Sequence, residues 1–392
     1  MLGIPRRIYL DNASATPLIP EVRVAMRGSE DTFGNPGSIH REGVAAKAAL
    51  EEARKGIAHE LEAKSGQIIF TSGLTESNNL AILGFARKLE MSDTELSDTH
   101  WVTTSIEHSS VLEPFSEIER RGGTVTHIEP DQRGLISAEA LRNALRPNTV
   151  FVSIGWANNE IGVVQPLSEL SRIIRAHPST KPIIFHSDAG QAPLYLSPRV
   201  HTLGIDLFSL GAGKLYGPRG TGALYVADAS RLAAHIVGGG QEKGLRSGTE
   251  EVVLAAGFAA ALDVVSRERA EEARRLGNLR DELAASVLSR IPDAIVNGDL
   301  KHTLPHMLNV SIPNISAEYL VLALDRAGIA LSTRSACNAG ESRSHVVAAL
   351  GGSAWRAANT LRISLGRETR ARDAKRLVEA LVRFVLTSGI RE

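Results

Sequence analysis

The chain has 392 residues, 43% of them hydrophobic, and its 44 Lys and Arg are matched by 44 Asp and Glu. This length suits two domains, or one large α/β domain with an appended unit, and the balanced charge leaves no excess of cations for direct contact with a nucleic acid or a membrane surface. No apolar run is long enough to span a bilayer and the first residues lack the apolar stretch of a signal peptide, so we expect a cytoplasmic location.

Short apolar runs alternate with longer helical patterns through the first two-thirds of the chain. The runs predict strands, and segments such as 110–121 and 167–176 predict helices. This alternation indicates an α/β fold, with a mostly parallel sheet that is covered by helices. The polar stretch 91–100 is expected to be a surface loop. The predicted strands are 67–71, 101–105, 125–129, 150–154, 183–186, 207–210 and 222–226.

The pattern changes near Glu250, where a long Ala- and Arg-rich helix is predicted to continue to about Arg290. After it we expect a strand at 307–312, a helix at 317–327, a strand at 361–365 and a C-terminal helix from Ala371. We interpret this region as a smaller α+β domain. The expected division is a large domain over 16–255 and a small domain that combines 1–15 with 256–392.

Two polar residues are expected where strands end. Asp188 follows the run 183–186, and Lys214 follows 207–210 in Gly211-Ala212-Gly213-Lys214. Ligands of open α/β sheets bind beyond the carboxyl ends of the strands. A desolvated lysine can form a Schiff base, and a carboxylate can pair with a protonated pyridine nitrogen, as pyridoxal phosphate requires. The same pattern also fits two simpler roles, a solvated side chain for Lys214 and a helix cap for Asp188.

Two strand-to-helix junctions carry further candidates. FTSGLTESNN (70–79) combines a glycine turn with a helix start, whose N–H groups and dipole suit a phosphate, and Thr75 adds a hydroxyl. TSIEHS (104–109) places His108 at the second junction, either as a cap or as a stacking partner for a cofactor ring. Each segment alone is also an ordinary helix start.

Ten motifs follow one another from Tyr9 to the C-terminal part of the chain: YLDNASATP, TSGLTESNN, SIEHSSVLEP, ANNEIGVVQPL, HSDAGQ, GKLYGPRGTGALY, GGGQEKGLRSGTEE, LNVSI, RSACNAG and LRISLGR. Together and in this order, they resemble the motifs of cysteine desulfurases, which belong to the class V aminotransferase-like branch of fold-type I pyridoxal-phosphate enzymes. The resemblance runs from Tyr9 to the C-terminal helix. It implies a fold-type I transferase with a seven-stranded sheet, pyridoxal 5'-phosphate as cofactor, L-cysteine as substrate and a homodimer.

The resemblance also implies a role for each matching residue. Lys214 holds the cofactor and moves protons, Asp188 pairs with the pyridine nitrogen, and His108 stacks on the ring and assists proton transfer. Gln191 lies near the ring hydroxyl. The remaining implied contacts are Leu74 and Thr75 with the phosphate, Thr249 with the phosphate of the other subunit, Asn159 with cofactor and substrate, and Arg362 with the substrate carboxylate.

Cys337 is the only cysteine, which excludes an intramolecular disulfide and a multi-thiolate metal site, and no metal is expected. A lone cysteine is by default a small buried hydrophobe. Its segment TRSACNAG is small, polar and loop-like, and Arg334 favours the thiolate. In the resembling family this cysteine takes the substrate sulfur as a persulfide and passes it to an acceptor protein. Iron–sulfur cluster assembly, tRNA thiolation and DNA phosphorothioation all remain open as destinations.

One position departs from the family pattern. The family has Ser-x-His-Lys where this chain has Gly211-Ala212-Gly213-Lys214, so two side-chain donors are absent. We expect backbone N–H groups or water to substitute, and the cofactor to be held less tightly. The pair Gly211→Ser with Gly213→His is expected to slow cofactor loss. The alternatives are a selenocysteine lyase, another class V aminotransferase-like enzyme, or a non-enzymatic scaffold.

Overall fold

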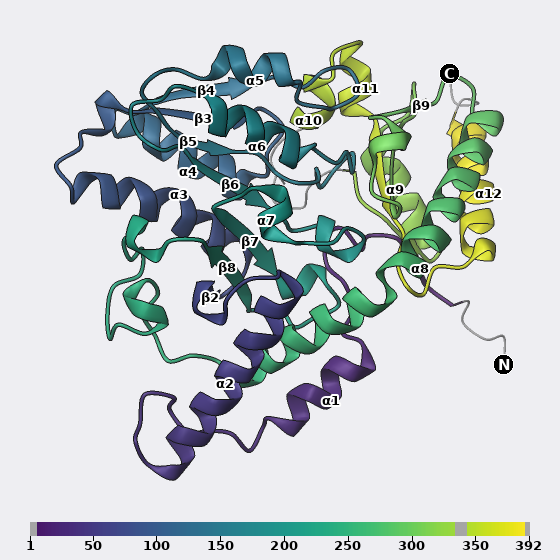
Figure 1. The fold of residues 1–392 in the computed structure, drawn as a ribbon. Helices are drawn as coiled ribbons and strands as arrows, with labels where there is room; N and C mark the ends of the chain where they lie inside the picture. Colours follow the sequence, from purple (N-terminus) through teal and green to yellow (C-terminus); the bar gives the residue numbers. More distant parts are fainter. Residues whose placement is uncertain (1–5, 334–342, 389–392) are drawn as a thin grey trace.

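The computed structural model describes residues 6–333 and 343–388, and its centre is a seven-stranded sheet in the order β2-β8-β7-β6-β5-β3-β4 (Figure 1). The strands from β7 to β4 are parallel, whereas β8 is antiparallel to both of its neighbours. The predicted fold class and strands are confirmed, with ends within two residues of those expected. The strands are β2 (Ile68–Thr71), β3 (His100–Thr104), β4 (Thr124–Ile128), β5 (Thr149–Ser153), β6 (Ile184–Asp188), β7 (Leu207–Gly211) and β8 (Gly222–Val226).

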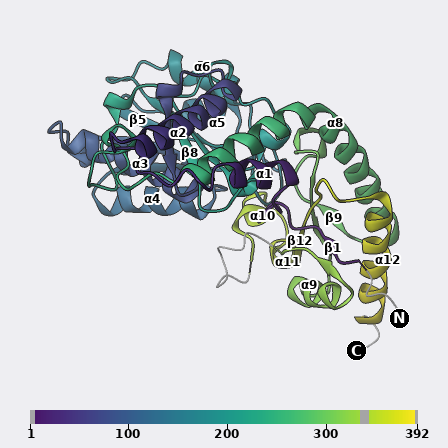
Figure 2. The same ribbon diagram turned by 90° about the horizontal axis from the view of Figure 1, so that it is seen from below.

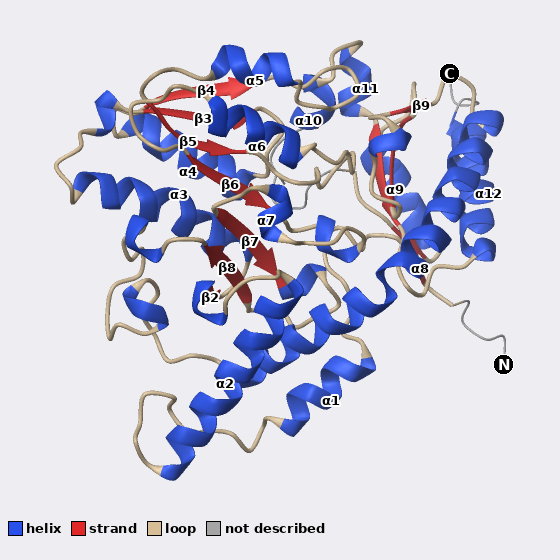
Figure 3. Ribbon diagram, viewed as in Figure 1, coloured by secondary structure: helices blue, strands red, loops and turns tan. Residues whose placement is uncertain are grey.

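Helices cover both faces of this sheet (Figure 3). Phe151 and Leu207 join an apolar cluster with α3 (Leu74–Glu90) and α4 (Ser109–Arg120). Their neighbours Val152 and Phe208 join the cluster on the opposite face. This alternation is what strands buried on both faces require. The opposite cluster includes residues of α2 (Arg41–Glu60), α5 (Ala138–Ala144), α6 (Leu167–Ala176), α7 (Val200–Leu203) and α8 (Val252–Arg290).

The 39-residue helix α8 links this sheet to a second, smaller one (Figure 2). One end of α8 packs against α2 and α1 (Pro20–Gly28), and the other end packs against α12 (Ala371–Ser388). The elements predicted after Glu250 are present. The smaller sheet has the order β12-β10-β9, with β9 (Ile295–Val296), β10 (Met307–Ser311) and β12 (Thr360–Ser364); beside it are β1 (Ile8–Tyr9), β11 (Ile329–Ala330), α9 (Ala317–Arg326), α10 (His345–Ala349) and α11 (Ala354–Ala358).

The prediction that 91–100 is a surface loop is wrong at three positions. Leu96 is only 3% exposed and Thr99 2%, and His100 is fully buried as the first residue of β3. His100 is tolerated inside because both ring nitrogens have hydroxyl partners, Thr149 and Thr126, each at 2.8 Å. Burial lowers the pKa of His100 to about 4, so the ring is neutral near pH 7. In the described residues, no helix is long and apolar enough to cross a membrane.

Candidate active site

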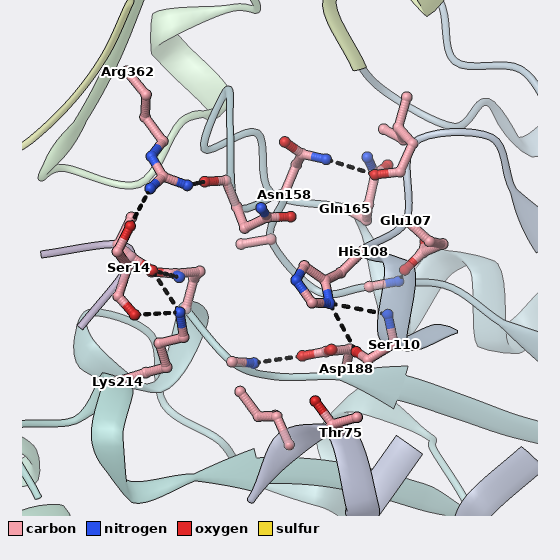
Figure 4. Close-up of a pocket in the computed structure, with 18 residues that line it drawn as sticks. Ser14, Thr75, Glu107, His108, Ser110, Asn158, Gln165, Asp188, Lys214 and Arg362 are labelled. Carbon is pink, nitrogen blue, oxygen red and sulfur yellow. Dashed lines mark hydrogen bonds between the residues drawn. The ribbon is translucent and has the colours of Figure 1, made fainter. Parts of the chain in front are cut away.

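A cavity of about 220 Å³ lies beyond the carboxyl ends of the parallel strands, where open α/β sheets bind ligands (Figure 4). Its walls come from the segments after β2, β3, β5, β6 and β7, together with the N-terminal segment and β12. Thr249 is not among the lining residues of this chain, and Cys337 lies outside the described residues. The predicted site residues that do line the cavity are Leu74, Thr75, His108, Asn159, Asp188, Gln191, Lys214 and Arg362.

Lys214 reaches the cavity through the short turn Ala212–Lys214 that follows β7. Its Nζ donates hydrogen bonds to the backbone oxygens of Ala13 and Ser14, each at 2.7 Å. The Ala13 oxygen also accepts a hydrogen bond of 2.8 Å from Nε2 of Gln191. The N-terminal segment therefore positions both Lys214 and Gln191.

Asp188 is the last residue of β6 and is held by two donors. Its Oδ1 accepts from the N–H of Gly190 at 2.8 Å, and its Oδ2 accepts from Nδ2 of Asn78 at 2.7 Å. The same Nδ2 donates to Oγ of Ser110 at 2.9 Å. The N-terminal parts of α3 and α4 are thus tied to the carboxylate at the end of β6.

His108 is the N-cap of α4, and its ring also lines the cavity, so the two roles considered for it are compatible (Figure 4). Nδ1 accepts a hydrogen bond from the N–H of Ser110 at 3.1 Å. Burial lowers the pKa of His108. The nearby negative charge of Asp188 acts in the opposite direction, but burial is the larger effect. Because Nδ1 is an acceptor, the neutral ring carries its proton on Nε2.

Arg362 lies in the middle of β12 and is 1% exposed. Its Nη2 donates to Oδ1 of Asp11 at 2.9 Å and to Oγ of Ser14 at 2.5 Å, while Nη1 donates to the backbone oxygen of Asn159 at 3.0 Å. Its Nε is buried and has no acceptor within the part of the chain that the structure describes. An incoming carboxylate would supply that acceptor.

The family model for aminotransferase class-V matches residues 8–377. The chain belongs to this family. It is 39% identical to cysteine desulfurase IscS of Dictyoglomus turgidum, over 97% of this chain and 95% of the relative. A solved NifS-like protein has a TM-score of 0.89 at 31% identity, covering 97% of this chain and 100% of that one. A structure of SspA in complex with cysteine has a TM-score of 0.78 at 35% identity, covering 91% of this chain and 98% of that one.

The cofactor of such class V enzymes is pyridoxal phosphate, and the residues around the cavity fit it. Oε1 of Gln191 is buried without a donor among the described residues, so it is available to the ring hydroxyl. Helix α3 begins at Leu74 beyond an N-cap, Gly73, that contributes no side-chain hydrogen bond. Gly73 has φ of +149°, a conformation that favours glycine. The N–H groups of this first turn suit the phosphate.

Several residues at the site received no role from the sequence, among them Asp11, Ser14, Asn78 and Glu107. The first two lie in YLDNASATP, and the others lie in TESNN and SIEHS. These motifs marked the segments, but only the fold brings Asp11 to Arg362 and Asn78 to Asp188. Burial of Glu107, beside His108 in the sequence, is not visible in the short motif SIEHS.

Proposed function

We propose that this protein is a pyridoxal-phosphate-dependent cysteine desulfurase, which converts L-cysteine to L-alanine and keeps the sulfur as a persulfide on Cys337. The observation that supports this most is that Lys214, Asp188 and Arg362 line one cavity. The amine of Lys214 and the carboxylate of Asp188 suit the cofactor. The buried guanidinium of Arg362, whose Nε has no partner among the described residues, suits the carboxylate of an α-amino acid.

When bound, the cofactor supplies an electron sink for the carbanion at the substrate α-carbon. Asp188 keeps the pyridine nitrogen protonated, and Nζ of Lys214 takes the α-proton. His108 stacks on the ring and offers the proton on its Nε2. Arg362 and Asn159 orient the substrate carboxylate, while Gln191, Leu74 and Thr75 hold the cofactor.

The net reaction balances without an external oxidant. The thiolate of Cys337 attacks the sulfur of the substrate, so that an S–S bond forms and the Cβ–S bond breaks. The electron pair of the broken bond stays on carbon, and a proton added there completes L-alanine. An acceptor thiol then takes the outer sulfur of the persulfide by thiolate exchange.

We further propose a cytoplasmic homodimer in which Thr249 binds the phosphate of the partner's site. In support, Thr249 is exposed, and it does not line the cavity of its own chain. The proposed large domain spans 16–255 and the small domain comprises 1–15 and 256–392. The sulfur is passed to an acceptor protein, such as a scaffold for iron–sulfur cluster assembly, with no direct contact to nucleic acid or membrane.

Incubation of the purified protein with L-cysteine and dithiothreitol tests this function. We expect alanine and sulfide in equal amounts, together with a visible absorbance band of lysine-bound cofactor that Lys214→Ala loses. A transaminase would form a keto acid without sulfide, and a selenocysteine lyase would form alanine from selenocysteine only. A wild-type protein with no cofactor band would contradict the proposal.

A further inference from the structure

Leu74 imposes a steric constraint on two glycines at the strand ends. A Cβ atom at Gly211 would lie 2.7 Å from Cγ of Leu74, and one at Gly190 would lie 2.8 Å from its Cδ1. Such separations are too short for real Cβ contacts, so a side chain at either position requires the leucine to move.

The backbone at these glycines does not itself demand glycine. Gly211 has φ of −142° and ψ of 122°, which is ordinary extended backbone. Gly190 is not among the described residues with positive φ. Side-chain packing, and not the conformation of the backbone, therefore disfavours a side chain at both positions: Leu74 crowds Gly211, and Leu74 with Oδ1 of Asp188, 3.1 Å from the added Cβ, crowds Gly190.

We propose that Leu74, Gly190 and Gly211 form one packing unit, in which the leucine occupies the space of a side-chain donor at 211. The phosphate is then left to the first turn of α3 and to Thr75. This inference rests on the proposed function, because it takes the phosphate to bind at this end of the cavity. Leu74 and Gly190 line the same cavity as Lys214. Leu74 is thus a positioning residue that makes part of the phosphate cup apolar.

The packing unit changes the expectation drawn from the sequence. Gly211→Ser alone does not restore a donor, because its Cβ collides with Leu74, and the substitution requires Leu74→Ala beside it. Gly213 behaves differently, since a Cβ there would lie 3.2 Å from Cγ of Arg219, whose side chain is exposed and can shift. Gly213→Ala is therefore a matched control: it also adds a side chain next to the lysine, but away from Leu74.

The test is a double-mutant cycle with Leu74→Ala, Gly211→Ser and both together, and a parallel cycle with Gly213→Ala in place of Gly211→Ser. The melting temperature is measured on full-length protein with and without cofactor. We expect Gly211→Ser to lower it by a few degrees, and Leu74→Ala to recover part of that loss. The Gly213→Ala cycle is expected to be additive. The cofactor dissociation rate, followed by absorbance, is the second measurement.

In the double variant Leu74→Ala with Gly211→Ser, the serine hydroxyl has room to donate to the phosphate. One hydrogen bond to a charged group should slow cofactor release roughly tenfold relative to Leu74→Ala. Additive melting temperatures in the Leu74–Gly211 cycle, or release as fast as from Leu74→Ala, would overturn the packing unit. A wild type that never binds the cofactor would instead contradict the proposed function, and the cofactor-free cycle would still be readable.

Discussion

Glu107→Gln should remove a buried carboxyl group whose ionisation opposes folding. The residue is 6% exposed. Burial raises the pKa of Glu107 to about 7, although Oε1 accepts hydrogen bonds from the N–H of Gly155 at 2.9 Å and from Oγ1 of Thr104 at 2.8 Å. The nearby charge of Asp188 raises this pKa further. Glutamine retains an oxygen for both donors and cannot ionise.

The pKa of Glu107 is about 7 in the folded protein against 4.5 in the unfolded chain, and this difference sets the direction of the change in stability with pH. Because the pKa is raised on folding, the contribution of the protonated Glu107 to the free energy of unfolding is complete below about pH 4.5 and is lost as the pH rises through about 7. The difference of about 2.5 in pKa, at roughly 1.4 kcal/mol for each pH unit, corresponds to about 3–4 kcal/mol. Glu107→Gln should therefore exceed the wild type in free energy of unfolding by up to about 3–4 kcal/mol near pH 8, with the gain vanishing toward pH 4.5.

Urea unfolding of both proteins, at several pH values and constant ionic strength, measures this difference. Taking variant minus wild type cancels the titration of all other groups that the substitution leaves unchanged. Glu169→Gln is the control, because Glu169 is exposed on α6 and its replacement removes the same charge without burial. A stability difference for Glu107→Gln that does not vary with pH would refute the linkage argument.

Two further predictions concern the reaction itself. Cys337→Ser should keep the absorbance of bound cofactor and lose sulfide release under reducing conditions, because no other thiol exists in the chain; sustained release would remove Cys337 from the reaction. Arg362→Ala should lower kcat/KM for cysteine roughly tenfold to a hundredfold, the effect of losing a charged hydrogen bond of about 1.5–3 kcal/mol. Arg362→Lys should recover only part of this, since an ammonium lacks the guanidinium fork. An unchanged kcat/KM in Arg362→Ala would place the substrate carboxylate elsewhere.

Most of the sheet could be predicted from the sequence because its strands other than the edge strand β4 are buried on both faces and so appear as largely apolar runs. Asp188 and Lys214 could be selected for the same reason, since each follows such a run. His100 was missed because its polarity suggested a loop, whereas its two hydroxyl partners come from β4 and β5. Partners on other strands leave no trace in the local pattern.

The packing of Leu74 was inaccessible for a related reason. The family resemblance implies a phosphate contact for Leu74, and the family pattern makes Gly211 a missing donor. Only the folded chain shows that the leucine side chain occupies the space of that donor. A departure from a family motif is therefore interpretable only with the residues that contact it, which here lie at the start of α3.

The segment from Asp11 to Ser14 connects Arg362 with Lys214. Asp11 and Oγ of Ser14 hold Arg362, while the backbone oxygens of Ala13 and Ser14 hold Lys214. The segment is itself anchored beside Arg362, because the N–H of Ala13 donates to Oγ of Ser364 at 3.0 Å. A carboxylate that arrives at Arg362 thus meets a guanidinium whose charge Asp11 already balances. Attraction by net charge is then weak, and the buried Nε of Arg362 is the donor that the described residues leave without a partner for the carboxylate.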